Sequence, residues 1–266
     1  MRISNLKESL FVALCLIQRD LVSFRNFFLN NIIDAAIWVS LTLLMFRYTF
    51  MKAGMNGADF ALFMVCGNVV SWGLLEIMGP LTHFVADITG KRSIEYTLTL
   101  PIGHSMAFIA IGFSFAVKSM LSSLCVLPIA KIIFWHELSF SNILWGKFLT
   151  IFILQNFFFG FFTLYLASLL HDIRAIRHIF RRLVFPLWWL GGYTFSWQQA
   201  YALSPYFGYA ALCNPLLYAL EGVRGAVLGQ EGYISFWYCV IVLCIAVCLC
   251  AFLAVRKLLV RLDCVW

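Results

Sequence analysis

The sequence predicts an all-α, polytopic membrane protein, and three observations support this prediction. Hydrophobic residues make up 63% of the chain, compared with about 45 to 50% in ordinary soluble domains. Charged residues make up only 12%. Apolar windows recur along the whole chain, and most approach the roughly 20 residues that a helix needs to cross a bilayer. We therefore expect residues 1–266 to form a single transmembrane domain.

The prediction counts six spans, which cover residues 32–50, 60–81, 102–133, 143–170, 183–195 and 234–255. The fifth window is short for a complete crossing. It also contains Pro186 and the pair Gly191-Gly192, which are unfavourable inside a helix. Its boundaries are the least well defined of the six.

Residues 1–25 are predicted to form an N-terminal amphipathic helix that lies at the membrane interface. Apolar residues recur at helical spacing, but charged and polar residues interrupt them too often for a span. The acidic Glu8 and the lack of a small-residue cleavage site argue against a signal peptide.

The positions of lysine and arginine predict the orientation in the membrane. With a cytoplasmic N-terminus, 13 of the 19 basic residues fall on the cytoplasmic side and five on the outer side, while Lys118 falls inside a span. The positive-inside rule then places both termini and the polar segment 83–103 in the cytoplasm. The net charge of +7 suits anionic lipid headgroups, and we do not expect nucleic acid as a partner.

Segment 83–103 is polar although long apolar runs flank it on both sides. Residues 93–98 are long enough for about two helical turns, and Pro101 prevents the helix from continuing. Ile94 and Leu98 fall on one side of these turns, which predicts a surface helix whose polar side faces water or a partner. Five residues are candidates for contact with that partner: Asp87, Lys91, Arg92, Glu95 and Tyr96.

Among the ionisable residues inside the predicted spans, Asp34, Glu76 and Lys118 are singled out as functional candidates. Such residues are costly in lipid and are therefore candidates for a transport path. A structural role is also open, because Asp34 and Glu76 lie close enough to the interface to reach headgroup water. By helical rise, Lys118 lies about 24 Å and Glu76 about 8 Å from the cytoplasmic edge, so we expect no direct pair. Lys118 is expected either to face a cavity or to extend toward the outer interface.

Residues 194–232 are too apolar for a free loop, and Pro205 and Pro215 divide them into short pieces. Asn214 is a good helix N-cap and Pro215 suits the first helical position, so a helix should begin there. Glu221 and Arg224 are three residues apart on this helix and can pair. Short helices at the outer side predict a re-entrant element.

Motifs for several chemistries are missing from the sequence. It contains no phosphate-binding G-x-x-x-x-G-K-[ST], no G-x-S-x-G and no H-E-x-x-H. It also contains no C-x-x-C pair. We therefore expect neither an enzyme nor a metal site. The basic segment 171–182 is expected to serve as a positive-inside anchor or as a second contact with an anionic partner or lipid.

Two stretches resemble the permease subunits of ATP-binding-cassette type-2 exporters, a family that includes polysaccharide, teichoic-acid and drug exporters. In that family the cytoplasmic loop reads roughly glycine-threonine-x-glutamate-x-leucine-leucine-x-x-proline, and Arg92 occupies the glycine position here. The residues that fit the loop pattern are Ser93, Ile94, Glu95, Tyr96, Leu98 and Pro101. The residues that resemble the pattern before the last span are Asn214, Pro215, Tyr218, Glu221 and Arg224.

The resemblance implies a permease that dimerises in the bacterial inner membrane and docks separate ATPase subunits through residues 87–101. ATP and magnesium would bind in those partner subunits and not in this chain. The expected substrate is a glycan, a lipid-linked glycan, a lipid or a hydrophobic drug. The alternative is an ion-coupled secondary transporter or channel that uses Asp34, Glu76 and Lys118.

Overall fold

The computed structural model describes residues 3–52, 57–91, 93–100, 102–135 and 143–263. Within these ranges every regular element is a helix and no strand occurs, which confirms the all-α prediction. The first half of the chain comprises α1 (Ile3–Lys52), α2 (Gly57–Leu75), α3 (Met78–Ala86), the π-helical turn η1 (Asp87–Lys91), α4 (Ser93–Thr99), α5 (His104–Leu124) and α6 (Val126–Ile133). The second half comprises α7 (Trp145–Leu169), α8 (Arg174–Ile179), η3 (Phe180–Val184), α9 (Phe185–Leu190), α10 (Trp197–Leu203), α11 (Pro205–Leu212), α12 (Pro215–Val227) and α13 (Phe236–Asp263).

Five helical stretches in the described residues are long and apolar enough to cross a membrane. They cover Lys7–Phe46, Phe60–Gly90, His104–Ile133, Trp145–Leu169 and Phe236–Leu262. Five of the six predicted spans overlap these stretches. The remaining window, 183–195, falls on the end of η3 and on α9, where Pro186 stands in the first turn and the helix ends at Gly191-Gly192. Gly192 follows with a φ of +91°, which lies outside the helical range, and the fifth predicted span stays a prediction.

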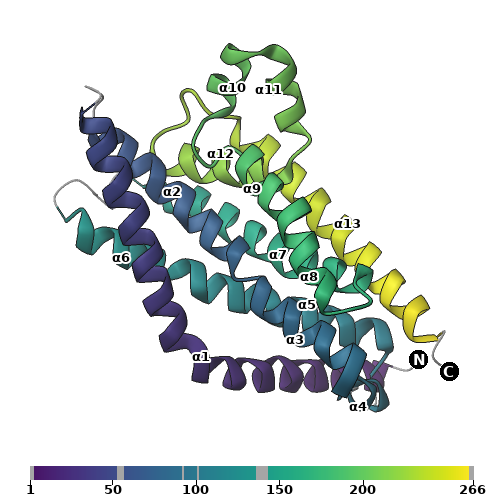
Figure 1. Ribbon diagram of the computed structural model, residues 1–266. Coiled ribbons are helices and arrows are strands. Elements are labelled where there is room, and N and C mark those ends of the chain that lie inside the picture. Colours follow the sequence, from purple (N-terminus) through teal and green to yellow (C-terminus); the bar gives the residue numbers. More distant parts are fainter. Residues whose placement is uncertain (1–2, 53–56, 92, 101, 136–142, 264–266) are drawn as a thin grey trace.

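The predicted interfacial helix is the first limb of α1 and not a separate element. Figure 1 shows that α1 bends, so that this limb lies across one end of the bundle while the second limb runs along it. Ser9, Ala13 and Leu16 form a buried face on the limb. Phe11 and Leu14 on the other side are exposed, which is the pattern of a helix that has protein on one face and lipid on another.

The core is organised around α2, in which every residue from Phe63 to Leu74 is buried. A helix that is apolar on all sides must be surrounded, and α2 contacts α1, α5, α6, α7 and α12. Small residues permit the closest approaches. At the crossing of α5 and α7, a Cβ on Gly160 would stand 2.5 Å from the backbone nitrogen of Ala116.

The two ends of the bundle are built differently. The start of α1, the end of α13 and the short helix α4 gather at one end (Figure 1). The pair α10–α11 projects from the opposite end (Figure 1). We call these the α4 end and the α10–α11 end.

Replacing Gly160 by alanine should destabilise the fold by about 1 to 3 kcal/mol, because α5 and α7 must move apart to admit the methyl group. Thermal unfolding of the purified protein in mild detergent measures this effect. Gly146→Ala in the same helix is the matched control, since a Cβ there meets nothing within 4 Å. Equal melting temperatures for the two variants would contradict the close crossing of α5 and α7.

Candidate functional site

The predicted surface helix is present as α4, and its burial follows the predicted amphipathic pattern. Ile94 and Thr97 are buried, and Leu98 packs against the core. The side chain of Tyr96 is 66% exposed, and that of Glu95 is partly buried. Arg92 and Pro101 lie outside the described residues, and of Lys91 only the backbone is described. The helix therefore has an apolar anchor and an accessible outer side.

The first limb of α1 packs directly on the segment that contains α4. Leu16 forms a small apolar cluster with Ile102 and Ala107, at the start of α5. Leu98 and Leu100 cover this cluster, and Leu98 also contacts the main core. α4 is thus joined by apolar contacts to both the α1 limb and the helix bundle.

A cavity of about 710 Å³ lies at this contact, bordered by α1, α2, α3, η1, α4 and α5. All three ionisable residues predicted for a transport path border it: Asp34, Glu76 and Lys118. Asp87, one of the five predicted partner-contact residues, also borders it. The structure therefore brings together residues from two sites that the sequence analysis treated separately.

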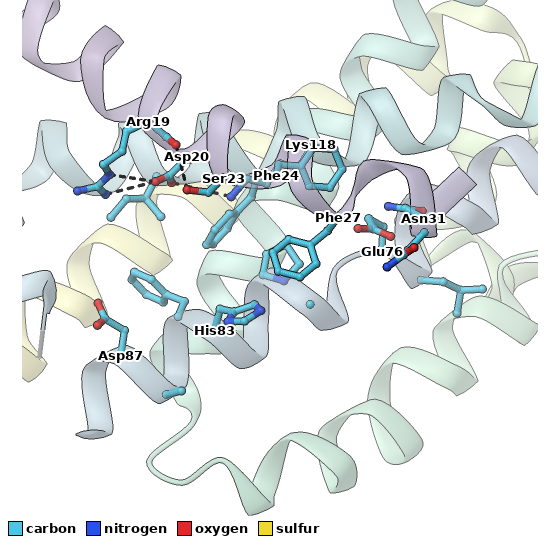
Figure 2. Close-up of a pocket in the computed structure, with 18 of the residues that line it drawn as sticks. Arg19, Asp20, Ser23, Phe24, Phe27, Asn31, Glu76, His83, Asp87 and Lys118 are labelled. Atoms are coloured by element: carbon cyan, nitrogen blue, oxygen red, sulfur yellow. Dashed lines mark hydrogen bonds and ion pairs between the residues drawn. The ribbon is translucent and has the colours of Figure 1, made fainter. Parts of the chain in front are cut away.

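Lys118 is paired with a residue that the sequence analysis did not single out. Its Nζ lies 4.0 Å from an Oδ of Asp20, and the hydroxyl of Ser114 donates to the same oxygen over 2.9 Å. Arg19 approaches the other oxygen at 3.2 Å. Figure 2 shows Arg19, Asp20 and Lys118 together at the cavity.

The side chain of Asn31, on α1, connects this helix to α2 and α5 beside the cavity. Its amide group donates to the Ser122 hydroxyl on α5 over 2.9 Å, and its carbonyl accepts the indole N–H of Trp72 on α2 at 3.2 Å. Its side chain also contacts Glu76, which stands at the junction between α2 and α3 (Figure 2). Asp34 follows on α1 and is exposed.

At the α10–α11 end, the start of α12 forms as predicted. The side chain of Asn214 accepts the backbone N–H of Leu216 at 3.0 Å, and Pro215 occupies the first turn. The Asn214 amide also donates to the carbonyl of Leu187 over 2.6 Å. The hydroxyl of Tyr218 donates to the carbonyl of Leu212 over 3.0 Å. These contacts join α12 to α9 and α11.

Glu221 and Arg224 pair as predicted, with 3.9 Å between an Oε and an Nη, and both side chains are 0% exposed. The carboxylate accepts the backbone N–H groups of Trp197 and Ile234 at 3.0 and 3.1 Å. The guanidinium donates to the carbonyls of Tyr193 and Phe195 over 2.8 and 3.0 Å. The pair therefore joins α12 to the chain that enters α10 and to the chain just before α13.

The face of the Phe63 ring also stabilises the charge of Arg224 inside the protein. Its guanidinium carbon lies 3.5 Å from the centre of the Phe63 ring on α2, where the ring face attracts a cation. Burial lowers the pKa of Arg224 to about 10, and the Glu221 carboxylate opposes this shift. The guanidinium consequently stays protonated at neutral pH.

No protein-family model matches the chain, and no curated protein matches it either. Within the described ranges, no three histidine, cysteine, aspartate or glutamate side chains are placed to hold a metal ion. The features that bear on function are therefore the α4 helix, the adjoining cavity and the buried pair at the α10–α11 end.

Replacing Arg224 by methionine should destabilise the protein by about 3 to 5 kcal/mol, because it leaves the Glu221 carboxylate buried without its cation. Loss of the two donated hydrogen bonds should also expose residues 193–214 to limited proteolysis. Arg177→Met on the exposed side of α8 removes the same charge at the surface and serves as the control. A protease-resistant Arg224→Met protein with an unchanged melting temperature would contradict the anchoring role.

Proposed function

We propose that the chain is the permease subunit of an ATP-driven exporter of the ATP-binding-cassette type-2 class. It dimerises in a bacterial inner membrane with both termini in the cytoplasm, and separate ATPase subunits bind ATP and magnesium. Residues 183–195 supply a sixth crossing, and α10 to α12 form a re-entrant element on the outer side. The translocation path is formed by the permease dimer.

The single observation that carries this proposal is the amphipathic burial pattern of α4. A helix with a buried apolar side and an accessible polar side is a suitable docking surface for a soluble partner. It lies at the same end of the molecule as the start of α1 and the end of α13 (Figure 1). Its contacts through Leu98 reach the α1 limb and the core. Movement of a docked ATPase would therefore be transmitted to the membrane helices.

The partner-contact residues divide into an outer contact group and a cavity group. Tyr96 is the most exposed of those whose side chains are described, and Glu95 precedes it on the accessible side of α4. Asp87 borders the cavity. We assign Glu95 and Tyr96 to direct contact with the ATPase, and Asp87 to the link between this contact and the cavity.

Reversing the charge at Glu95 should weaken ATPase binding about tenfold, which corresponds to roughly 1.4 kcal/mol. The measurement is the amount of nucleotide-binding subunit that copurifies with Glu95→Lys from native membranes in mild detergent, together with its ATP hydrolysis. Asp172→Lys makes the same change at an exposed residue between α7 and α8 and is the control.

Two results would overturn the exporter proposal. One is a wild-type chain that never brings an ATPase with it under several mild conditions. The other is a Glu95→Lys variant that retains full copurification and full hydrolysis, which would remove α4 as the docking element.

An ion-coupled secondary transporter is the second candidate, and a specific observation favours it. Asp34, Glu76 and Lys118 border one cavity, and the pair between Lys118 and Asp20 supplies a further titratable partner. Such an arrangement is typical of a relay for protons or cations.

A proton gradient separates the two candidates. In ATP-free proteoliposomes, a secondary transporter should show gradient-driven proton flux that falls severalfold in Glu76→Gln. The exporter should show no such flux, because its driving force is hydrolysis in the partner subunit. Glu231→Gln, an exposed residue that does not border the cavity, controls for the loss of a carboxylate.

A further inference from the structure

The walls of the cavity at the α4 end combine aromatic rings with charged groups. Five rings border it, from Phe24, Phe27, Trp72, Phe84 and Phe115. Its volume of about 710 Å³ falls within the 300 to 1,000 Å³ typical of pockets that enclose a small organic molecule. The cavity therefore suits a ligand with a substantial apolar body.

The charges around the cavity are unequally compensated. Both of its cations, Arg19 and Lys118, are engaged with one carboxylate, that of Asp20. Three further carboxylates border the cavity, those of Asp34, Glu76 and Asp87. Four carboxylates therefore stand against two cations, and the charged side chains around the cavity are negative in sum.

This combination discriminates between classes of ligand. An anion would be repelled, because carboxylates outnumber cations around the cavity. A bare metal ion would find no group of three suitable ligands among the described residues. An organic cation gains from both features, because carboxylates attract its charge and the faces of aromatic rings bind cations.

The cavity is also open on the side of α1. Phe27 borders it and is 61% exposed, and two polar residues that also border it, Asn30 and Asp34, are exposed as well. In a membrane, the exposed apolar side of α1 faces lipid. A ligand with an apolar body can thus arrive from the bilayer and present its charged group to Asp34 and Glu76.

We propose that this cavity binds amphiphilic organic cations, meaning a protonated or quaternary amine, or a similar onium group, on an apolar body. Such cations are also the substrate class of the exporter, and this part of the inference rests on the proposed function. Among the expected substrates, it selects the hydrophobic drug or cationic lipid over the glycan.

Tetraphenylphosphonium is a suitable probe, because tetraphenylborate has nearly the same shape and the opposite charge. The complete chain, reconstituted in phosphatidylcholine nanodiscs without ATPase, is titrated with each radiolabelled ion, and binding to empty nanodiscs is subtracted. Saturable binding of the cation, at least tenfold tighter than that of the anion, is the expected result. Equal or tighter binding of tetraphenylborate would overturn the proposal.

Substitutions then locate the bound cation. Asp34→Asn combined with Glu76→Gln should weaken cation binding at least tenfold, while Glu231→Gln, outside the cavity, should leave it unchanged. If the double variant does not fold, Asp34→Asn and Phe27→Ala alter exposed side chains and should each weaken binding severalfold. Unchanged affinity in the folded variants would refute this site.

The assay is independent of the ATPase, so the two proposals can fail separately. Cation binding by a chain that copurifies with no ATPase would support the cation site and refute the exporter proposal. Copurification with an ATPase, but no binding of tetraphenylphosphonium, would support the exporter proposal and refute the cation site.

Discussion

The ion pair between Glu221 and Arg224 is the interaction on which the α10–α11 end depends. Two opposite charges with 0% exposure are costly to bury unless they are close together and their remaining hydrogen-bonding groups are satisfied. Here the pair satisfies four backbone groups, from Tyr193, Phe195, Trp197 and Ile234, while the Nε of Arg224 has no hydrogen-bond partner among the described residues. All four groups lie in irregular chain or at the first residue of a helix, outside the regular hydrogen-bonding pattern of a helix. The pair therefore makes a non-helical chain path compatible with an apolar environment.

The α4 end is held together by weaker polar contacts. Asp20 and Lys118 are 4.0 Å apart, and their side chains are 22% and 14% exposed, so solvent screens the attraction in part. Asn31 joins three helices through neutral hydrogen bonds, which typically contribute about 1 kcal/mol each. The helices around the cavity are therefore joined by weak polar contacts, which cost little free energy to break. The α10–α11 end, where the backbone path is non-helical, is held by the fully buried pair of Glu221 and Arg224.

Sequence reasoning succeeded where the relevant interaction is local. The N-cap at Asn214, the helix at 93–99 and the pairing of Glu221 with Arg224 all follow from spacings of a few residues. It did not find Asp20 as the partner of Lys118. Helical rise estimates how deep a residue lies in a straight span, but it does not reveal the bend in α1 that brings Asp20 to Lys118. The fifth span was predicted from apolarity although Pro186 and Gly191-Gly192 were recognised as unfavourable, and α9 does end at Gly191. Contacts between remote segments depend on bends and crossings that one sequence does not display.

The bend in α1 also gives the proposed docking site a short route to the cavity. Leu98 on α4 contacts the cluster that contains Leu16. One turn after Leu16, on the same side of the helix, stands Asp20, which pairs with Lys118 in the cavity wall. Apolar contacts between packed side chains do not stretch, so a displaced α4 must either carry the α1 limb with it or expose Leu16 and Leu98. In the proposed exporter, moving the limb shifts Asp20 relative to Lys118, and the shape of the cation site thereby becomes sensitive to the state of the ATPase.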